Sequence, residues 1–244
     1  MIPTRRVSLF LRRVVSVPAA SFAVGILAVS CWPARADASL VVVTALARPP
    51  LPAILRAMES GAEDIVDFAL AGDRASVVAE AARLRAAANS KAVESLARSG
   101  GIATKIAQLK GRLSRVAQLA RAHSFIAVAL AANAVSQLMP DLYSRFQDPV
   151  PSPILRLDYL DREAQLRSLA GQPEKIALAV RQLRPTWASV RPKVIAAGGA
   201  MEAGAYQRHV AAMNRLEATA AKRVQAEAVR GLELVDDLER VFVR

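Results

Sequence analysis

Three side chains in the last part of the chain have the types and spacing of a ligand site. Tyr206, His209 and Met213 are separated by three and four residues, so a helix would place them side by side on one face. Imidazole and thioether together are ligands that copper accepts, and they also suit the axial positions of a b-type haem. The alternative is that His209 is half-buried at the edge of the core and binds no ligand.

A haem site would also need an axial ligand from another helix, and Met58 and Met139 are the candidates. The second histidine, His123, has no Met, Cys or acidic residue three or four positions away, so we expect it to be structural or solvated. The metal or haem hypothesis therefore depends on His209.

Carboxylates gather at two further places in the sequence. Glu63 and Asp67 would share a helix face, as would Asp158 and Asp161, so one interpretation is a cation site with oxygen ligands. The alternative is that these acids lie early in helices, where the helix dipole favours negative charge. The two groups are Glu63, Asp64 and Asp67, and Asp158, Asp161 and Glu163.

Trp187 has an unusual setting, because Pro185 and Pro192 lie on either side of it. Proline inside a helix removes a backbone hydrogen bond and pushes against the preceding turn, so we expect a kink or a break there. A large aromatic side chain at a kink can anchor a partner, or it can fill the gap that the kink opens.

Reactive motifs are missing from the sequence. It contains no His-Glu-x-x-His, Gly-x-Ser-x-Gly, phosphate-loop or dinucleotide-binding pattern. The single cysteine, Cys31, lies close to the N-terminus, so disulfides, Cys-based metal sites and c-type haem are excluded from the remainder of the chain. The sequence therefore predicts a binding or scaffold protein without a cofactor and without catalytic activity. The alternative is a carrier of copper or b-type haem that uses the His209 and Met213 site.

The first 36 residues have the pattern of an export signal. Arginines precede an uncharged apolar run at Val14–Trp32, and the run is followed by Ala34 and Ala36, which fit the small-x-small pattern of a signal peptidase site. We expect residues 1–36 to be a signal peptide that is cleaved after Ala36. The folded part of the protein would then be periplasmic or secreted.

Other fates of this segment remain open. The apolar run is just long enough to span a bilayer as an uncleaved anchor. Cys31 follows Ala-Val-Ser, which loosely resembles a lipoprotein acylation box but lacks the usual leucine. We expect contact with a membrane only if the leader is retained or Cys31 is acylated.

Much of the positive charge belongs to the leader. The whole chain has 33 basic and 21 acidic residues, and loss of the five leader arginines lowers its formal net charge from +12 to +7. The remaining cations are interleaved with Asp and Glu, as is typical of solvated helix faces. We therefore expect a protein partner in the periplasm or at the membrane surface, and no nucleic-acid partner.

The two halves of the chain resemble each other. Ile-Leu-Arg at 54–56 recurs at 154–156, and Leu-Ala-Gly at 70–72 recurs at 169–171. Such self-similarity is typical of tandem structural units. We expect an extended lead-in at 37–48, a first helical unit at 49–146 and a second at 149–244, both within one compact domain.

Apolar residues recur every three or four positions, which indicates amphipathic helices. The sequence predicts an all-α fold, a bundle of about six helices made of two tandem three-helix units. Gly72 and Gly171 can close helices in the left-handed conformation, while Asp73 and Pro173 suit the starts of the helices that follow. The expected helices cover residues 52–71, 74–98, 102–145, 154–170, 173–197 and 201–243.

Overall fold

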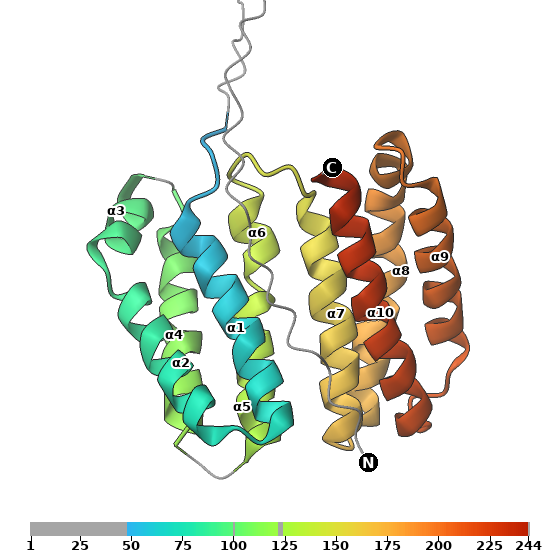
Figure 1. Ribbon diagram of the computed structural model, residues 1–244, viewed down its shortest axis with the longest axis horizontal. Helices are drawn as coiled ribbons and strands as arrows, with labels where there is room; N and C mark the ends of the chain where they lie inside the picture. Colours follow the sequence, from blue (N-terminus) through green and yellow to red (C-terminus); the bar gives the residue numbers. More distant parts are fainter. Residues whose placement is uncertain (1–47, 100, 122–123, 244) are drawn as a thin grey trace, which may run out of the picture. The chain divides into compact units, whose positions relative to one another are not determined.

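The structure is a computed structural model, and it describes residues 48–99, 101–121 and 124–243. The predicted signal peptide with Ala34 and Ala36, the extended lead-in up to residue 47, and Cys31 and His123 all lie outside these residues. The described chain belongs to one compact unit, Leu46–Arg244, and its regular secondary structure is entirely helical, so the all-α prediction is confirmed (Figure 1).

Helices follow one another with short connections. In chain order they are α1 (Ala53–Ala71), α2 (Arg74–Ala88), α3 (Lys91–Ser99), α4 (Ala103–Leu119), α5 (Phe125–Ser136), α6 (Met139–Tyr143), α7 (Ser152–Leu169), α8 (Pro173–Ala196), α9 (Ala200–Arg215) and α10 (Ala221–Phe242).

Two four-helix groups account for most of the packing. In the first bundle, α1, α2, α4 and α5 surround one hydrophobic cluster, with α1 and α4 each contacting both α2 and α5. In the second bundle, α7, α8, α9 and α10 surround another cluster, with α7 and α9 each contacting both α8 and α10 (Figure 1). The bundles are joined because α5 and α6 pack against α7.

The helix ends confirm several local predictions. Gly72 closes α1 with a φ of 74°, and Gly171 follows α7 with a φ of 64°, both in the left-handed region. The side chain of Asp73 accepts a hydrogen bond from the backbone N–H of Ser76 at 3.1 Å and so caps α2. Pro173 is the first residue of α8.

The expected three-helix units differ from the structure, because both long helices are broken and the helix expected at 74–98 is divided into α2 and α3 after Ala88. The helix predicted at 102–145 ends at Leu119, and α5 begins after Ser124, whose hydroxyl accepts from the N–H of Ala127. The helix predicted at 201–243 ends where Leu216 becomes extended. In each case the helices before and after the break present apolar faces to the same core. The spacing of apolar residues therefore continues across the turn, and the sequence pattern gives no sign of it.

Helix α8 passes through both internal prolines without a break. Of the kink or break expected there, the break is therefore wrong. Pro185 and Pro192 are seven residues apart and exposed, so they lie on the same outer face. The carbonyl groups that lose a donor belong to Arg181 and Ala188, which are also exposed, and water can replace the missing bonds.

One stretch of the described chain, Phe125–Tyr143, is apolar and long enough to cross a membrane, and 56% of it is buried inside the protein. This stretch comprises α5 and α6. Because α5 packs against α1, α4 and α7, its neighbours account for its apolar composition.

Candidate functional site

A buried chain of hydrogen bonds joins α7, α9 and α10 in the second bundle. His209 on α9 lies between two carboxylates: its Nε2 is 2.9 Å from Oδ1 of Asp161 on α7, and its Nδ1 is 3.0 Å from Oε1 of Glu227 on α10. The hydroxyl of Tyr206 donates to Oδ2 of Asp161 at 2.7 Å. We call Tyr206, Asp161, His209 and Glu227 the buried polar chain.

Most of this chain is sealed from solvent. Tyr206, Asp161 and His209 have no exposed surface, whereas 17% of the Glu227 side chain is exposed. The buried polar chain therefore reaches the surface at Glu227.

The two carboxylates determine the protonation state of His209. An ionised carboxylate only accepts hydrogen bonds, so when both carboxylates are ionised each ring nitrogen of His209 donates, which is the arrangement of an imidazolium. Burial lowers the pKa of His209, but the hydrogen bonds and charges of Asp161 and Glu227 raise it, and the net result lies above its ordinary value. Burial and the charge of Asp161 raise the pKa of Tyr206, which remains a donor.

Gly231 on α10 makes room for this arrangement. A Cβ atom at Gly231 would lie 2.6 Å from Oδ2 of Asp161 and 2.6 Å from Nε2 of His209. Both neighbours are fully buried and have little freedom to move. Only glycine lets α10 approach α7 and α9 this closely.

The predicted ligand residues Tyr206, His209 and Met213 lie together, but His209 is more deeply buried than expected. Tyr206 and His209 are neighbours, with ring centroids 5.1 Å apart, and Met213 is fully buried in the same cluster. His209 is fully buried rather than at the edge of the core. Sequence reasoning missed Glu227 altogether and grouped Asp161 with the wrong partners, because only the fold brings these helices together.

The geometry leaves His209 no free nitrogen for copper or haem iron. Both ring nitrogens are engaged by carboxylates, and Met58 and Met139 belong to the hydrophobic cluster of the first bundle rather than to that of the second. Within residues 48–243, as far as they are described, no group of three or more His, Cys, Asp or Glu could hold a metal ion. The metal-carrier hypothesis stays a prediction that this geometry does not favour.

Trp187 packs inside the second bundle. Its side chain is 2% exposed, its ring centroid is 5.0 Å from that of Tyr206, and its Nε1 donates to Oε1 of Gln207 at 2.8 Å. This position favours the core-filling alternative over a role as a partner contact.

The acidic groups singled out in the sequence face basic side chains. Arg162 on α7 lies 3.4 Å from a carboxylate oxygen of Glu63 on α1 and 2.6 Å from one of Asp158, and so links the two bundles. Burial raises the pKa of both carboxyl groups, against the lowering effect of Arg162. Glu163 pairs with Arg167 at 2.7 Å.

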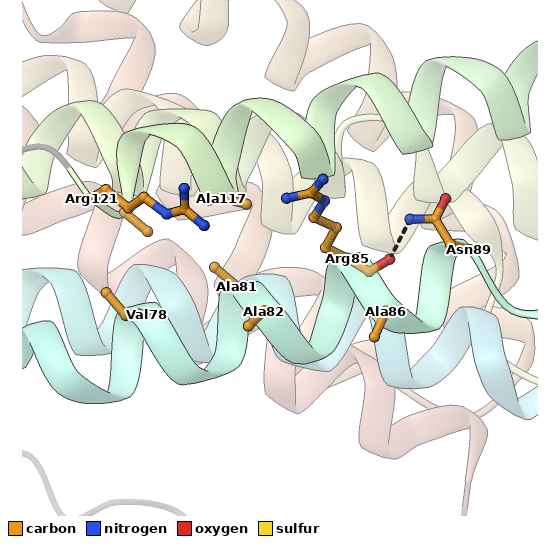
Figure 2. A pocket seen from close by; sticks show the side chains of 9 residues that line it. Val78, Ala81, Ala82, Arg85, Ala86, Asn89, Ala117 and Arg121 are labelled. Carbon is orange, nitrogen blue, oxygen red and sulfur yellow. Dashed lines mark hydrogen bonds between the residues drawn. The ribbon is translucent and has the colours of Figure 1, made fainter.

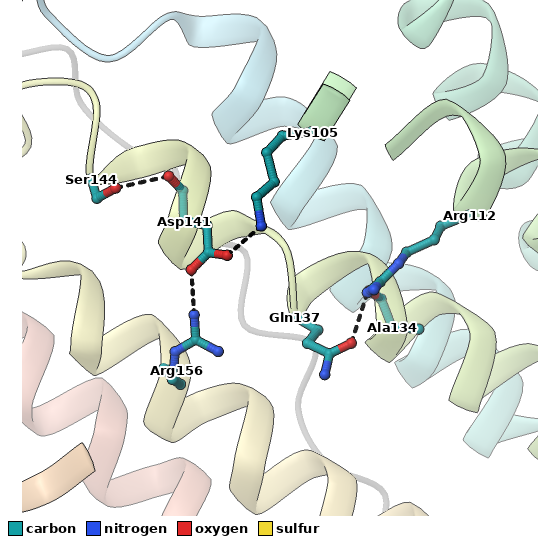
Figure 3. Close-up of polar contacts among 7 residues, drawn as sticks. All are labelled: Lys105, Arg112, Ala134, Gln137, Asp141, Ser144 and Arg156. Carbon is teal, nitrogen blue, oxygen red and sulfur yellow. Dashed lines mark hydrogen bonds and ion pairs between the residues drawn. The ribbon is translucent and has the colours of Figure 1, made fainter. Parts of the chain in front are cut away.

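A second link between the bundles is centred on Asp141 of α6. Lys105 of α4 and Arg156 of α7 each donate to one of its oxygens at 2.6 Å, and they help to hold its pKa below the usual range (Figure 3). Beside it, Arg112 donates to the side chain of Gln137 at 2.9 Å. These contacts fix α4, α6 and α7 relative to one another.

The first bundle carries a surface groove of about 340 Å³ between α2 and α4. Figure 2 shows the side chains of Arg85 and Arg121 extending into the space between these helices. Among the described residues, neither guanidinium has a carboxylate partner. The apolar residues that line the groove are Val78, Ala81, Ala82, Ala86, Ala117 and Ala120.

Another groove, of about 370 Å³, lies between α9 and α10. Glu227 lines it together with Arg215 and Arg223. The exposed end of the buried polar chain therefore opens into this groove.

The chain matches no protein-family model, and no curated protein or solved structure is significantly similar to it. Its function is therefore inferred from the geometry of its own residues.

Proposed function

We propose that the protein is an exported, all-helical binding protein that holds an acidic peptide segment of a partner in the groove between α2 and α4, and that it acts without catalysis. The observation that carries the proposal is the pair Arg85 and Arg121, two guanidinium groups beside an alanine-rich wall. The groove thus offers both charge and apolar surface to a partner.

The wall of the groove suits a partner backbone. Alanine side chains from both helices, such as Ala82 and Ala117, leave room for an incoming helix or extended segment to approach closely. Val78, with 39% of its surface exposed, adds apolar contact.

The two arginines define the chemistry of the partner. A guanidinium group binds a carboxylate through two parallel hydrogen bonds, a geometry that lysine does not offer. A segment with two Asp or Glu side chains on one face can satisfy Arg85 and Arg121 while its apolar face covers the alanines.

Binding of a labelled helical peptide that carries two glutamates on an alanine face tests the proposal. Fluorescence anisotropy of this probe should rise with the wild-type protein. The double variant Arg85→Ala/Arg121→Ala should bind about 5- to 30-fold more weakly, since an exposed ion pair contributes roughly 0.5–1 kcal/mol.

A matched control separates the groove from net charge. Arg145→Ala/Arg208→Ala removes the same charge from two other exposed positions, and it should leave the affinity unchanged. Equal loss in both double variants, or no binding by the wild-type protein, would contradict a groove-specific site.

Export is part of the same proposal, supported by the leader pattern. Mass spectrometry of the exported protein should show an N-terminus at Asp37. Ala36→Leu should block this cleavage, because signal peptidase needs a small residue there, whereas Ala38→Leu should not. An unprocessed wild-type chain in the cytosol would contradict export.

We also propose that the two bundles are tandem units, each with four helices rather than the three expected from the sequence. The contact order α1, α2, α4, α5 in the first bundle parallels α7, α8, α9, α10 in the second. The left-handed Gly72 and Gly171 follow the first helix of each bundle. These parallels support a duplication as the origin of the two bundles.

A further inference from the structure

The outer face of α8 is strongly basic. Its five cations are all exposed, and within the part of the chain that the structure describes none of them pairs with a carboxylate. The helix has one acidic residue, Glu174, in its first turn. The even mixture of charges expected from the sequence therefore does not hold on this helix. The cations are Lys175, Arg181, Arg184, Arg191 and Lys193.

Four of the cations flank a largely apolar ridge, and the fifth, Arg181, lies on it. At roughly 100° per residue, Leu178, Pro185 and Pro192 lie along the line opposite the buried face of α8. Leu178 is 43% exposed, and both prolines are exposed as well. By the same geometry, Arg184 and Arg191 lie on one side of this ridge, and the two lysines lie on the other.

This pattern is the one that suits a helix lying on a membrane surface. Long cationic side chains can reach lipid phosphates while the apolar side chains between them enter the headgroup region. The two proline rings add apolar surface to this face and bring no backbone N–H donor. The backbone carbonyl groups that they leave without a partner are exposed on the same face. A soluble polyanion would use the cations but would gain nothing from the ridge.

The length of the face also favours a surface over a small ligand. Lys175 and Lys193 are separated along the helix by about 27 Å, at 1.5 Å per residue. One phosphate or carboxylate can contact only part of this face, whereas an anionic bilayer can contact all five cations at once.

We propose that the outer face of α8 binds the surface of an anionic phospholipid membrane. This interaction is separate from the peptide groove, which lies in the other bundle. It also needs neither the leader nor acylation of Cys31, so the processed protein can bind lipid by itself.

Co-sedimentation of the exported, leader-free protein with vesicles tests this proposal. Vesicles of equal parts phosphatidylglycerol and phosphatidylcholine should bind the protein, and pure phosphatidylcholine vesicles should bind it far more weakly. Binding should fall at about 1 M salt, where the Debye length shrinks to about 3 Å.

Two sets of variants locate the surface. Arg184→Ser/Arg191→Ser should lower the partition coefficient about 25-fold, at roughly fivefold for each charge. Leu178→Ser should also lower it, without any change of charge. Lys91→Ser/Arg98→Ser, which removes two exposed cations from α3, should change it less than about twofold.

Three results would overturn the proposal. The first is equal binding to anionic and neutral vesicles, and the second is an equal loss in the α8 and α3 double variants. The third is binding of polyglutamate through Arg184 and Arg191 without vesicle binding, which would assign the face to an acidic protein. The variant Arg85→Ala/Arg121→Ala leaves α8 intact, so it should still bind anionic vesicles. The peptide-groove proposal can therefore fail without any effect on vesicle binding.

Discussion

The imidazole of His209 and the carboxylate of Asp161 meet at 2.9 Å inside the second bundle, although 48 residues separate them in sequence. Neither side chain has any exposed surface. Such a buried ion pair loses its hydration on folding, and it is retained only where each charge has partners. Tyr206 and Glu227 supply those partners, so the four residues act as one unit that fixes three helices.

Removal of one charge from this unit should strongly destabilise the protein. Asp161→Asn leaves the imidazolium with a single carboxylate, and we expect the free energy of unfolding to fall by about 3 kcal/mol, the lower end for breaking a buried pair. Urea denaturation measures this change. Asp237→Asn, which removes one partner of the exposed Asp237–Arg240 pair, should cost less than about 1 kcal/mol.

A double variant distinguishes coupling from general damage to the core. Asp161→Asn combined with His209→Gln replaces the charged pair by two amides of similar shape. If the charges are coupled, the double variant should lose less stability than the sum of the single variants, by about 1 kcal/mol or more. Simple additivity would show that the two residues act independently.

Stability should fall as the pH rises through the titration of His209. Its folded pKa is raised, so its contribution is fully present below the unfolded pKa of about 6.5 and is lost as the pH passes the folded pKa. The melting temperature should therefore decrease above about pH 6.5. Glu63 and Asp158, whose pKa values are also raised, contribute slopes of the same sign.

The variant His209→Gln isolates the histidine from those carboxyl groups. It retains Glu63 and Asp158, so the difference between the wild-type and variant melting curves belongs to the buried polar chain. This difference should shrink as the pH rises. A difference that is independent of pH, or that grows with pH, would contradict an imidazolium at this position.

Local patterns in the sequence predicted most of the secondary structure. The ends of α1 and the starts of α2 and α8 follow from Gly72, Asp73 and Pro173, because capping depends on residues within one turn. The break near Leu216 carries no glycine or proline, and the core periodicity runs through it. Its position is set by packing of α9 against α10, which sequence spacing does not contain.

Less of the candidate site could be predicted from the sequence, because the site also depends on packing between helices. Spacing placed Tyr206 beside His209, since both lie on one helix. Asp161 and Glu227 belong to other helices, and nothing in their local sequence indicates that they face an imidazole. Gly231 was a possible signal, because a glycine in the interior of a regular helix often marks a close approach.

Gly231→Ala should therefore be destabilising, although alanine normally favours helices over glycine by about 1 kcal/mol. The new methyl group would clash with Asp161 and His209, and overpacking of this kind costs about 1–3 kcal/mol. Gly111→Ala on α4 is the matched control, because a Cβ atom there meets nothing within 4 Å, and it should stabilise the protein. A stabilising effect at both positions would mean that α10 can move away from α7 and α9.

Filling the groove between α2 and α4 should weaken peptide binding even though both arginines remain. Ala82 is exposed and lines the groove, so Ala82→Trp places a large ring where the partner segment would lie, with little effect on the core. We expect the affinity for the two-glutamate peptide to fall at least tenfold, or about 1.4 kcal/mol, in the anisotropy measurement. Ala188→Trp adds the same ring to an exposed position on α8 and should leave the affinity unchanged. If Ala82→Trp binds as tightly as the wild-type protein, the peptide contacts the arginines from outside, and the alanine wall has no part in recognition.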